Sequence, residues 1–351
     1  MAGSSVLVAV VNFLDFFYTL NMAFLRSMLD TVSSIGLKNI LIGDRTGPNP
    51  DFLNREKYLL DGYVVLITGS SSGIGKETAR DLALRGATII MANRDIQKSE
   101  RVVEQLQKDE GESVLSADRF KIRRLDLADL ASVKSFADVV KKEFPVIDML
   151  INNAGYAYYG GSQTLTKDGF EITFQTNHLG HFYLTSLLID NILASQKGPK
   201  IINVSSVAHA GAKMNWDDLN GDKNYGGLNS YAQSKLANVL FTRQLNELYR
   251  GKINTYSLHP GLIATDIVRN DWLFRWGVNW FYWLPFLVNE KQGAFTTIYC
   301  AVSEQAKTES GLYYSDCRVA EPGSVAKDRE VAEKLWKVSC DLLKIEWSVE
   351  S

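Results

Sequence analysis

The sequence of 351 residues predicts a doubly wound α/β domain with a parallel sheet, beginning near Leu60. Three observations support this fold class. Short β-branched runs alternate with helical stretches from Tyr63 onward. A glycine-rich turn follows the first of these runs and opens a helix. Apolar residues make up 46% of the chain and charged residues 22%, which is the composition of a globular protein.

The elements follow one another as a parallel sheet requires, because each strand is joined to the next by a crossover. Strands are expected at 63–68, 88–92, 120–125, 147–151, 200–204 and 253–258, and helices at 74–85, 96–108 and 132–143. A single domain is therefore expected over 60–345, with 346–351 as a tail. Residues 36–59 form the predicted connector, since glycines and prolines break any periodic pattern there.

The first 35 residues are expected to form an apolar helix that associates with a membrane. Residues 6–25 are apolar over a length that can span a bilayer. One narrow stripe at helical spacing holds the polar residues Asn12, Asp15, Thr19 and Arg26, which suits a helix that spans the bilayer or lies in its interface. The alternative is a helix packed on the protein's own core. Basic residues follow this segment rather than precede it, which favours a cytoplasmic domain.

Charge and cysteine usage exclude several classes of protein. The formal net charge of -2 lacks the basic excess of a nucleic-acid binder. Three scattered cysteines are too few for a disulfide framework or a zinc site. The histidines lack metal-ligand spacing with acidic or cysteine partners, so no metal is expected.

A glycine-rich turn, TGSSSGIG at 68–75, joins the first strand to the first helix. Glycines permit close backbone approach to a ligand, and the helix N-terminus favours a phosphate. The context predicts a dinucleotide site, and the spacing T-G-x-x-x-G-I-G resembles that of the short-chain dehydrogenase/reductase family. The resemblance implies a single Rossmann-type domain that binds a nicotinamide cofactor.

The end of the second strand favours NADP(H) as the cofactor. An NAD site usually has an acidic residue there, which accepts from the ribose 2′-hydroxyl. This chain has neutral Asn93 followed by Arg94, whose guanidinium suits a 2′-phosphate. Lys76 adds positive charge to the glycine loop. In the alternative, Asp95 holds the ribose and Arg94 is a solvated surface residue.

Four residues in the family's order predict a catalytic centre. Tyr231 and Lys235 are spaced i and i+4, so both project from one face of a helix. A nearby ammonium favours the phenolate and lowers the tyrosine pKa, which suits Tyr231 as general acid and base in hydride transfer. The resemblance assigns Ser206 to hold the substrate oxygen, with Ser205 as the alternative. It assigns Asn177 to a water-linked proton relay.

Further cofactor contacts are implied by the family's motifs. The resemblance puts Asp126 by the adenine ring, the N-N-A-G motif beside the cofactor and the turn from Pro260 at the carboxamide. The expected cofactor-binding residues are Gly69, Ser71, Gly73, Ile74, Gly75, Asn93, Arg94, Asp126, Asn153, Ala154, Gly155, Tyr231, Lys235, Pro260, Gly261, Ile263 and Thr265. His259, just before this turn, is expected to be structural.

Longer stretches, such as NHLGH at 177–181 and SKLANVLFTR at 234–243, are similar to the retinol dehydrogenase-like branch. That branch implies an NADP(H)-dependent oxidoreductase acting on a lipophilic aldehyde or ketone and its alcohol: retinoid-like, steroid or lipid-derived. It also implies an intracellular membrane, the endoplasmic reticulum or another, with the catalytic domain facing the cytoplasm. A Trp-rich segment, about 266–292, is expected to be a substrate lid that touches the membrane, or else a buried packing helix.

Two other functions fit parts of the pattern. A non-catalytic NADP(H)-binding accessory subunit of a membrane assembly would share the fold, but the complete set Asn177, Ser206, Tyr231 and Lys235 favours an enzyme. A nucleotide-sugar epimerase shares the Tyr-x-x-x-Lys pair, but the loop spacing and the apolar lid argue against it. The sequence leaves the substrate, the physiological direction and homo-oligomer formation open.

Overall fold

The computed structural model describes residues 47, 50–158, 162–263 and 287–347. The predicted N-terminal helix at 1–35 lies outside these residues, as do Thr265 and the four tryptophans from Trp272 to Trp283. Among the described residues, none of the helices is both long and apolar enough to cross a membrane.

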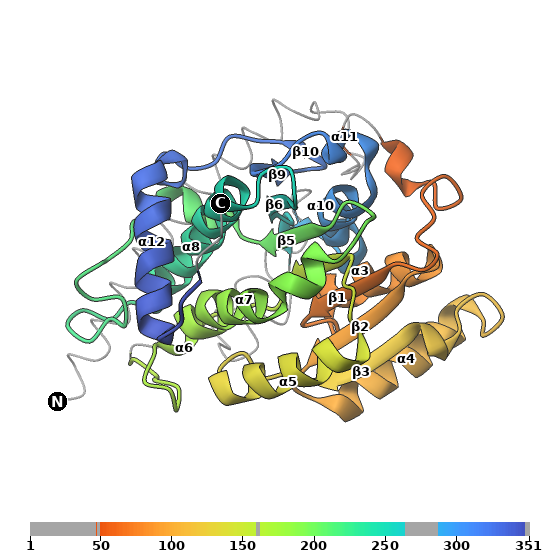
Figure 1. The fold of residues 1–351 in the computed structure, drawn as a ribbon, viewed down its shortest axis with the longest axis horizontal. Coiled ribbons are helices and arrows are strands. Elements are labelled where there is room, and N and C mark those ends of the chain that lie inside the picture. Colours follow the sequence, from red (N-terminus) through yellow and green to blue (C-terminus); the bar gives the residue numbers. More distant parts are fainter. Residues whose placement is uncertain (1–46, 48–49, 159–161, 264–286, 348–351) are drawn as a thin grey trace.

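One sheet of eight strands forms the centre of a single Rossmann-type domain, in the order β10-β9-β6-β5-β4-β1-β2-β3 (Figure 1). Its strands are β1 (Val64–Thr68), β2 (Thr88–Asn93), β3 (Phe120–Arg124), β4 (Met149–Asn152), β5 (Lys200–Val204), β6 (Asn254–His259), β9 (Leu312–Ser315) and β10 (Arg318–Val319). Neighbouring strands run parallel except at the edge, where β10 pairs antiparallel with β9. The expectation of a parallel, doubly wound sheet is thus confirmed for its main part and corrected at this edge.

Helices cover both faces of the sheet. On one face lie α3 (Gly73–Leu84), α4 (Ile96–Glu110) and α10 (Glu290–Val302), and on the other α5 (Leu130–Glu143), α7 (Gly180–Leu193), α8 (Gly227–Leu248) and α12 (Arg329–Leu343). In Figure 1, α12 lies beside α8. Each crossover connects parallel strands through a helix, as the alternating sequence pattern predicts.

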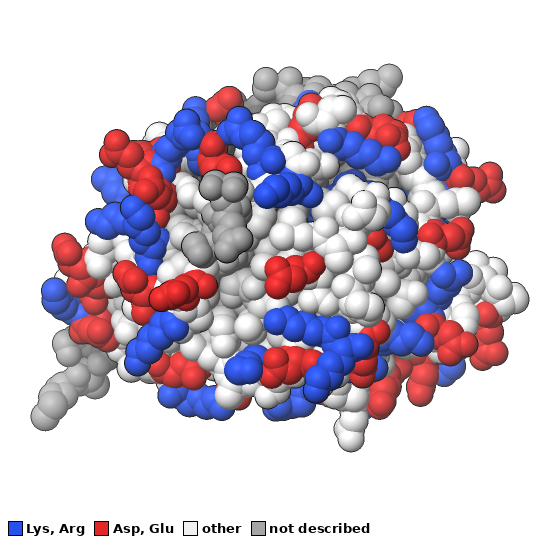
Figure 2. All heavy atoms as spheres, viewed as in Figure 1, with Lys and Arg blue, Asp and Glu red and all other residues white. Residues whose placement is uncertain are grey.

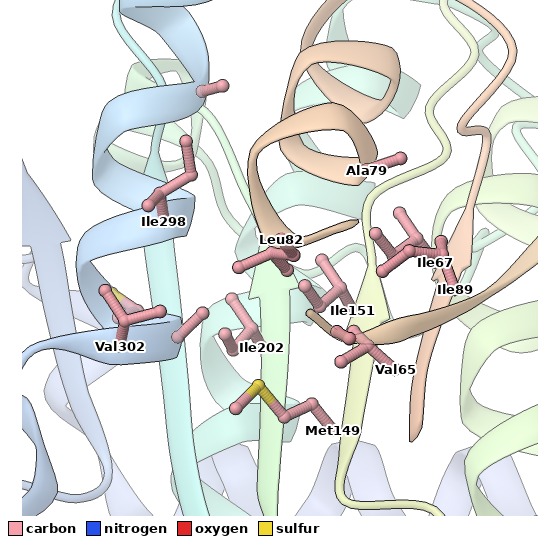
Figure 3. Packing of buried hydrophobic residues seen from close by; sticks show 14 of the residues in the cluster. Val65, Ile67, Ala79, Leu82, Ile89, Met149, Ile151, Ile202, Ile298 and Val302 are labelled. Carbon is pink, nitrogen blue, oxygen red and sulfur yellow. The ribbon is translucent and has the colours of Figure 1, made fainter. Parts of the chain in front are cut away.

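The core consists of apolar side chains that alternate between the two faces of each strand. In β1, Val65 and Ile67 pack in the cluster under α3 and α10, while Leu66 belongs to the cluster on the opposite face. Figure 3 shows the first cluster, with Leu82 of α3 and Ile298 of α10 over the strands. Burial on both faces explains why these strands are near-continuous apolar runs in the sequence.

Part of the predicted connector packs against the domain. The short helix η1 (Pro50–Leu53) inserts Phe52, which is only 2% exposed, against the ring of Tyr299 at 5.4 Å. The fully buried Arg85 donates to the carbonyl of Phe52 at 2.8 Å and to the carboxylate of Asp81 at 2.7 Å. These hydrogen bonds of Arg85 attach residues 50–60 to the end of α3.

The described surface carries charge of both signs. On the face shown in Figure 2, Lys and Arg side chains are interspersed with Asp and Glu side chains. This mixture is expected for a chain with 38 basic and 40 acidic residues.

Candidate active site

Three motifs of the predicted site lie at the carboxyl ends of parallel strands. The strand order reverses at β1, which lies between β2 on one side and β4 on the other. In open α/β sheets, ligands bind in the crevice outside such a reversal point. The glycine loop follows β1, the N-N-A-G motif follows β4, and the serine pair follows β5.

The glycine loop is shaped by close contacts that only glycine allows. A Cβ atom at Gly75 would lie 2.3 Å from the carbonyl oxygen of Gly69. Gly69 itself has φ of +68°, and a Cβ atom there would lie 2.8 Å from Cα of Ala154. Helix α3 begins at Gly73, so its first N–H groups face the loop. The loop therefore offers backbone donors without side chains in the way.

The N-N-A-G segment is bonded to the start of the glycine loop. The main-chain N–H groups of Asn153 and Ala154 both donate to the Thr68 hydroxyl at 3.0 Å. The Asn153 side chain also donates to the Thr68 carbonyl at 2.8 Å. Three bonds thus fix the ends of β1 and β4 relative to each other.

The strand ends next to the loop carry two exposed guanidinium groups. Asn93 ends β2, is 3% exposed, and donates to the Ser70 hydroxyl at 3.1 Å. Arg94, which follows, is exposed. The register pairs Asn93 with Arg124 at the end of β3, and Arg124 is exposed too. The sequence pattern did not single out Arg124, because only the register of the two strands reveals its place.

Three other charged residues considered for the cofactor site have hydrogen-bond or ion-pair partners within the protein. The Asp95 carboxylate accepts from the main-chain N–H of Lys98 at 2.8 Å and caps α4. Lys76, expected to add charge to the loop, forms ion pairs with Glu77 at 3.3 Å and with Glu290 at 3.1 Å. The ammonium of Lys76 is therefore directed toward the start of α10. Asp126, on the third strand's loop, accepts from the N–H of Ala128 at 3.1 Å.

Tyr231, Lys235 and Ser206 come together where β5 meets α8. The ammonium nitrogen of Lys235 lies 5.7 Å from the ring centre of Tyr231 and donates to the Val204 carbonyl at 3.2 Å. The Tyr231 phenol hydrogen-bonds with the Ser206 hydroxyl. Tyr231 is 9% exposed and Lys235 is 2% exposed, so the pair is largely shielded from water.

Burial dominates the acid–base behaviour of this pair. It raises the pKa of Tyr231, while the hydrogen bond with Ser206 acts in the opposite direction. It lowers the pKa of Lys235 to about 8. The pKa of Tyr231 rises because a buried phenolate loses its hydration, and the ammonium of Lys235 is not among the causes of the shift. Tyr231 holds its proton at neutral pH.

The two serines after β5 have different partners. Ser205 is 2% exposed, and its hydroxyl donates to the main-chain oxygen of Lys235 at 2.7 Å. The Ser206 hydroxyl contacts Tyr231 and accepts from the N–H of Ala208 at 3.2 Å. The Ser206 hydroxyl thus lies at the phenol of Tyr231, while the Ser205 hydroxyl is bonded to the main chain of α8.

Two histidines hold the backbone around Ser206. Nδ1 of His209 lies 2.6 Å from the carbonyl oxygen of Ser206, and its Nε2 accepts from the N–H of Gly323 at 3.0 Å. Nδ1 of His259 accepts from the N–H of Val207 at 3.2 Å. The contact of His259 with this backbone N–H agrees with its expected structural role.

Asn177 lies in a π-helical turn, η3 (Gln175–Leu179), and is fully buried. Its Oδ1 accepts from the N–H of Tyr156 at 2.7 Å, and its Nδ2 donates to the carbonyl of Tyr156 at 2.9 Å. The same Nδ2 donates to the Ser234 hydroxyl at 2.9 Å. The side chain thus ties the segment after the N-N-A-G motif to α8, next to Lys235. Single-turn π segments are frequent at functional sites.

The turn after β6 is held by a small second sheet. Strands β7 (Leu262–Ile263) and β8 (Leu287–Val288) pair in parallel. Gly261 has φ of +95°, and a Cβ atom there would lie 2.9 Å from Cγ2 of Val288. Pro260, Gly261 and the backbone of Ile263 thus follow the carboxyl end of β6. Within the described part of the chain, no group of three or more His, Cys, Asp and Glu could hold a metal ion.

Comparison with known proteins finds similar sequences over most of the chain. The sequence model of the short chain dehydrogenase family matches residues 63–275. Retinol dehydrogenase 12 of Mus musculus is 41% identical over 289 residues, which cover 82% of this chain and 88% of that protein. Retinol dehydrogenase 11 of Homo sapiens is 41% identical over 285 residues, which cover 81% and 86%.

Solved structures share the fold. An uncharacterised protein from Mycobacterium paratuberculosis aligns with a TM-score of 0.66 and 33% identity, over 84% of this chain and 98% of that chain. The NADP complex of RhlG from Pseudomonas aeruginosa aligns with a TM-score of 0.57 and 23% identity, over 76% and 98%. At that level of identity the second likeness shows the fold alone.

Proposed function

The chain belongs to the short-chain dehydrogenase family, in its retinol dehydrogenase-like branch, and on this premise we propose that it is an NADP(H)-dependent oxidoreductase. It interconverts a lipophilic aldehyde or ketone and its alcohol. One observation carries the proposal above the others: a buried tyrosine that is hydrogen-bonded to a serine, with a buried lysine 5.7 Å from its ring.

The residues of this chain supply the proton and hold the substrate oxygen, while bound NADPH supplies the hydride. The Ser206 hydroxyl donates to the carbonyl oxygen and orients it. Tyr231 then gives its proton to the developing alkoxide. Because burial raises the pKa of Tyr231, the phenol is protonated at neutral pH and is suited to act as an acid in carbonyl reduction. In alcohol oxidation the same group must first lose that proton.

The glycine loop and the adjacent strand ends fit NADP(H). The close contacts at Gly69 and Gly75 leave a cradle that a Cβ atom would fill, as a pyrophosphate site requires. The exposed guanidinium groups of Arg94 and Arg124 suit a 2′-phosphate. The Asp95 carboxylate caps α4, which argues against its use as an NAD-type ribose ligand.

A lipophilic substrate and a membrane location complete the proposal. Relatives that are 41% identical over most of their length are retinol dehydrogenases, which supports a retinoid-like substrate. The apolar length of residues 6–25 supports attachment to an intracellular membrane such as the endoplasmic reticulum, with the catalytic domain in the cytoplasm. If full-length protein stays in the supernatant after high-speed centrifugation without detergent, this attachment is wrong.

Tyr231→Phe tests the enzymatic function. The full chain in detergent is assayed for NADPH oxidation with retinal, a steroid ketone and a medium-chain aldehyde. The variant is expected to lose turnover while its NADPH affinity, measured by fluorescence titration, stays near that of the wild type. Full activity in Tyr231→Phe would refute the general acid. A wild type that binds NADPH but reduces none of these carbonyls would favour the accessory-subunit alternative.

A further inference from the structure

His181 is a buried histidine between the glycine loop and the catalytic residues. It is the second residue of α7, directly after the π turn η3, and is 1% exposed. Its Nε2 lies 2.8 Å from the hydroxyl oxygen of Thr68, the last residue of β1. Its Nδ1 lies 2.9 Å from the main-chain oxygen of Asn177. One ring therefore contacts both parts of the proposed site.

The partners of the ring determine which nitrogen carries its proton. A main-chain carbonyl can only accept, so Nδ1 donates to Asn177. In a neutral ring Nε2 is then an acceptor, and it receives the proton of the Thr68 hydroxyl. The other acceptor near this hydroxyl, the carbonyl of Ile151, is more distant at 3.5 Å. Burial lowers the pKa of His181 to about 4, which keeps the ring neutral.

The Thr68 hydroxyl uses all of its hydrogen-bonding capacity in this arrangement. It accepts from the N–H groups of Asn153 and Ala154 and donates to His181. An unbroken series of bonds thus runs from the N-N-A-G segment through Thr68 and His181 to Asn177. Such networks can act as a unit when every member is satisfied.

We propose that His181 is a positioning residue that couples the cofactor loop to the catalytic centre. It fixes the Asn177 carbonyl inside a π turn, where the regular i→i+4 ladder is interrupted. Asn177 in turn holds Tyr156 and Ser234, the neighbour of Lys235. The inference rests on the proposed function, because it assigns His181 to the site of that reaction.

Three substitutions separate the two halves of the network. His181→Phe keeps a ring but removes both bonds. In His181→Asn the side-chain amide nitrogen lies near the former position of Nδ1. The amide can therefore donate to the Asn177 carbonyl, but it does not reach Thr68. His181→Gln reaches Thr68 with an accepting oxygen and gives up the donation to Asn177.

The full-length variants are compared by NADPH affinity, by kcat with retinal, and by hydrogen exchange of the Tyr156 amide. We expect His181→Phe to bind NADPH about tenfold more weakly, as the loss of one buried hydrogen bond implies. Its kcat should fall about tenfold or more, since small misplacements in a site slow chemistry strongly. His181→Asn should restore kcat and the protection of the Tyr156 amide, and His181→Gln should restore NADPH affinity.

His178→Phe is the matched control. His178 lies in the same π turn, but its Nε2 contacts Ser339 at 2.9 Å and its ring packs against Phe174, so it makes neither of the two bonds of His181. NADPH affinity and Tyr156 exchange should therefore be unchanged in this variant. The proposal is overturned if neither Asn nor Gln at 181 improves on Phe, or if Phe equals the wild type. A wild type without turnover would instead refute the proposed function, and nucleotide binding and amide exchange would still test the coupling.

Discussion

Two single residues, Arg94 and Arg124, lie at the ends of neighbouring strands. They are distant in the sequence, but the pairing of β2 with β3 brings Arg124 opposite Asn93, the neighbour of Arg94. Both are exposed at the strand ends. Arg123 differs, because its guanidinium is engaged by the Glu143 carboxylate at 2.8 Å and by the Ile122 carbonyl at 2.7 Å.

Replacing either exposed arginine should change the cofactor preference. We expect Arg94→Ala and Arg124→Ala each to weaken NADPH binding about tenfold, because a hydrogen bond to a charged group contributes about 1.5–3 kcal/mol. NADH binding should change little, since that cofactor lacks the 2′-phosphate. Fluorescence titration with both cofactors measures the difference, and Arg123→Ala serves as the control. Equal losses for NADPH and NADH would contradict the assignment.

The glycine loop is a structural element in which segments of backbone approach each other closely. Gly75→Ala would force a Cβ atom to 2.3 Å from the Gly69 carbonyl oxygen. We expect the loop to shift, the free energy of unfolding to fall by about 1–3 kcal/mol, and NADPH affinity to fall at least about tenfold. Gly211→Ala is the control, because a Cβ atom there meets nothing within 4 Å. Wild-type affinity in Gly75→Ala would show that the loop tolerates the added methyl group.

Sequence patterns predicted the strands that stand out as apolar, β-branched runs. The six parallel strands from β1 to β6 agree with the expected runs to within about two residues, which is the usual uncertainty of element ends. The edge strands β9 and β10 were missed, because four and two residues are too few for a clear alternation. The π turn was missed as well, because its geometry depends on contacts of Asn177 and His181 with distant residues.

The site was predictable to the extent that local spacing encodes it. Tyr231 and Lys235 are one helical turn apart, and the serine pair follows a recognisable strand. The sequence alone therefore predicts these residues as candidates for the site. Arg124 is placed opposite Asn93 by the register of two strands, and His181 meets Thr68, 113 residues away in the sequence, only in the folded chain. No local pattern distinguishes them from an ordinary core histidine or a surface arginine.

All four histidines of the chain are buried in the folded molecule. Burial lowers the pKa of His178 to about 3 and that of His181 to about 4. In the unfolded chain both titrate near a pKa of about 6.5. Between that value and pH 4 the unfolded state therefore binds more protons than the folded state, so the free energy of unfolding falls as the pH falls through this window.

Acid should accordingly destabilise the domain well before its carboxylates are protonated. Each histidine should account for a loss on the order of 2 kcal/mol between pH 6.5 and pH 5, since one pKa unit corresponds to about 1.4 kcal/mol. Urea unfolding of the full chain at several pH values in this range measures the slope. His178→Phe should make the slope shallower, because it removes one of the two groups that take up a proton only on unfolding. A free energy of unfolding that is level from pH 7 to pH 5 would mean that these rings are accessible to protons in the folded protein.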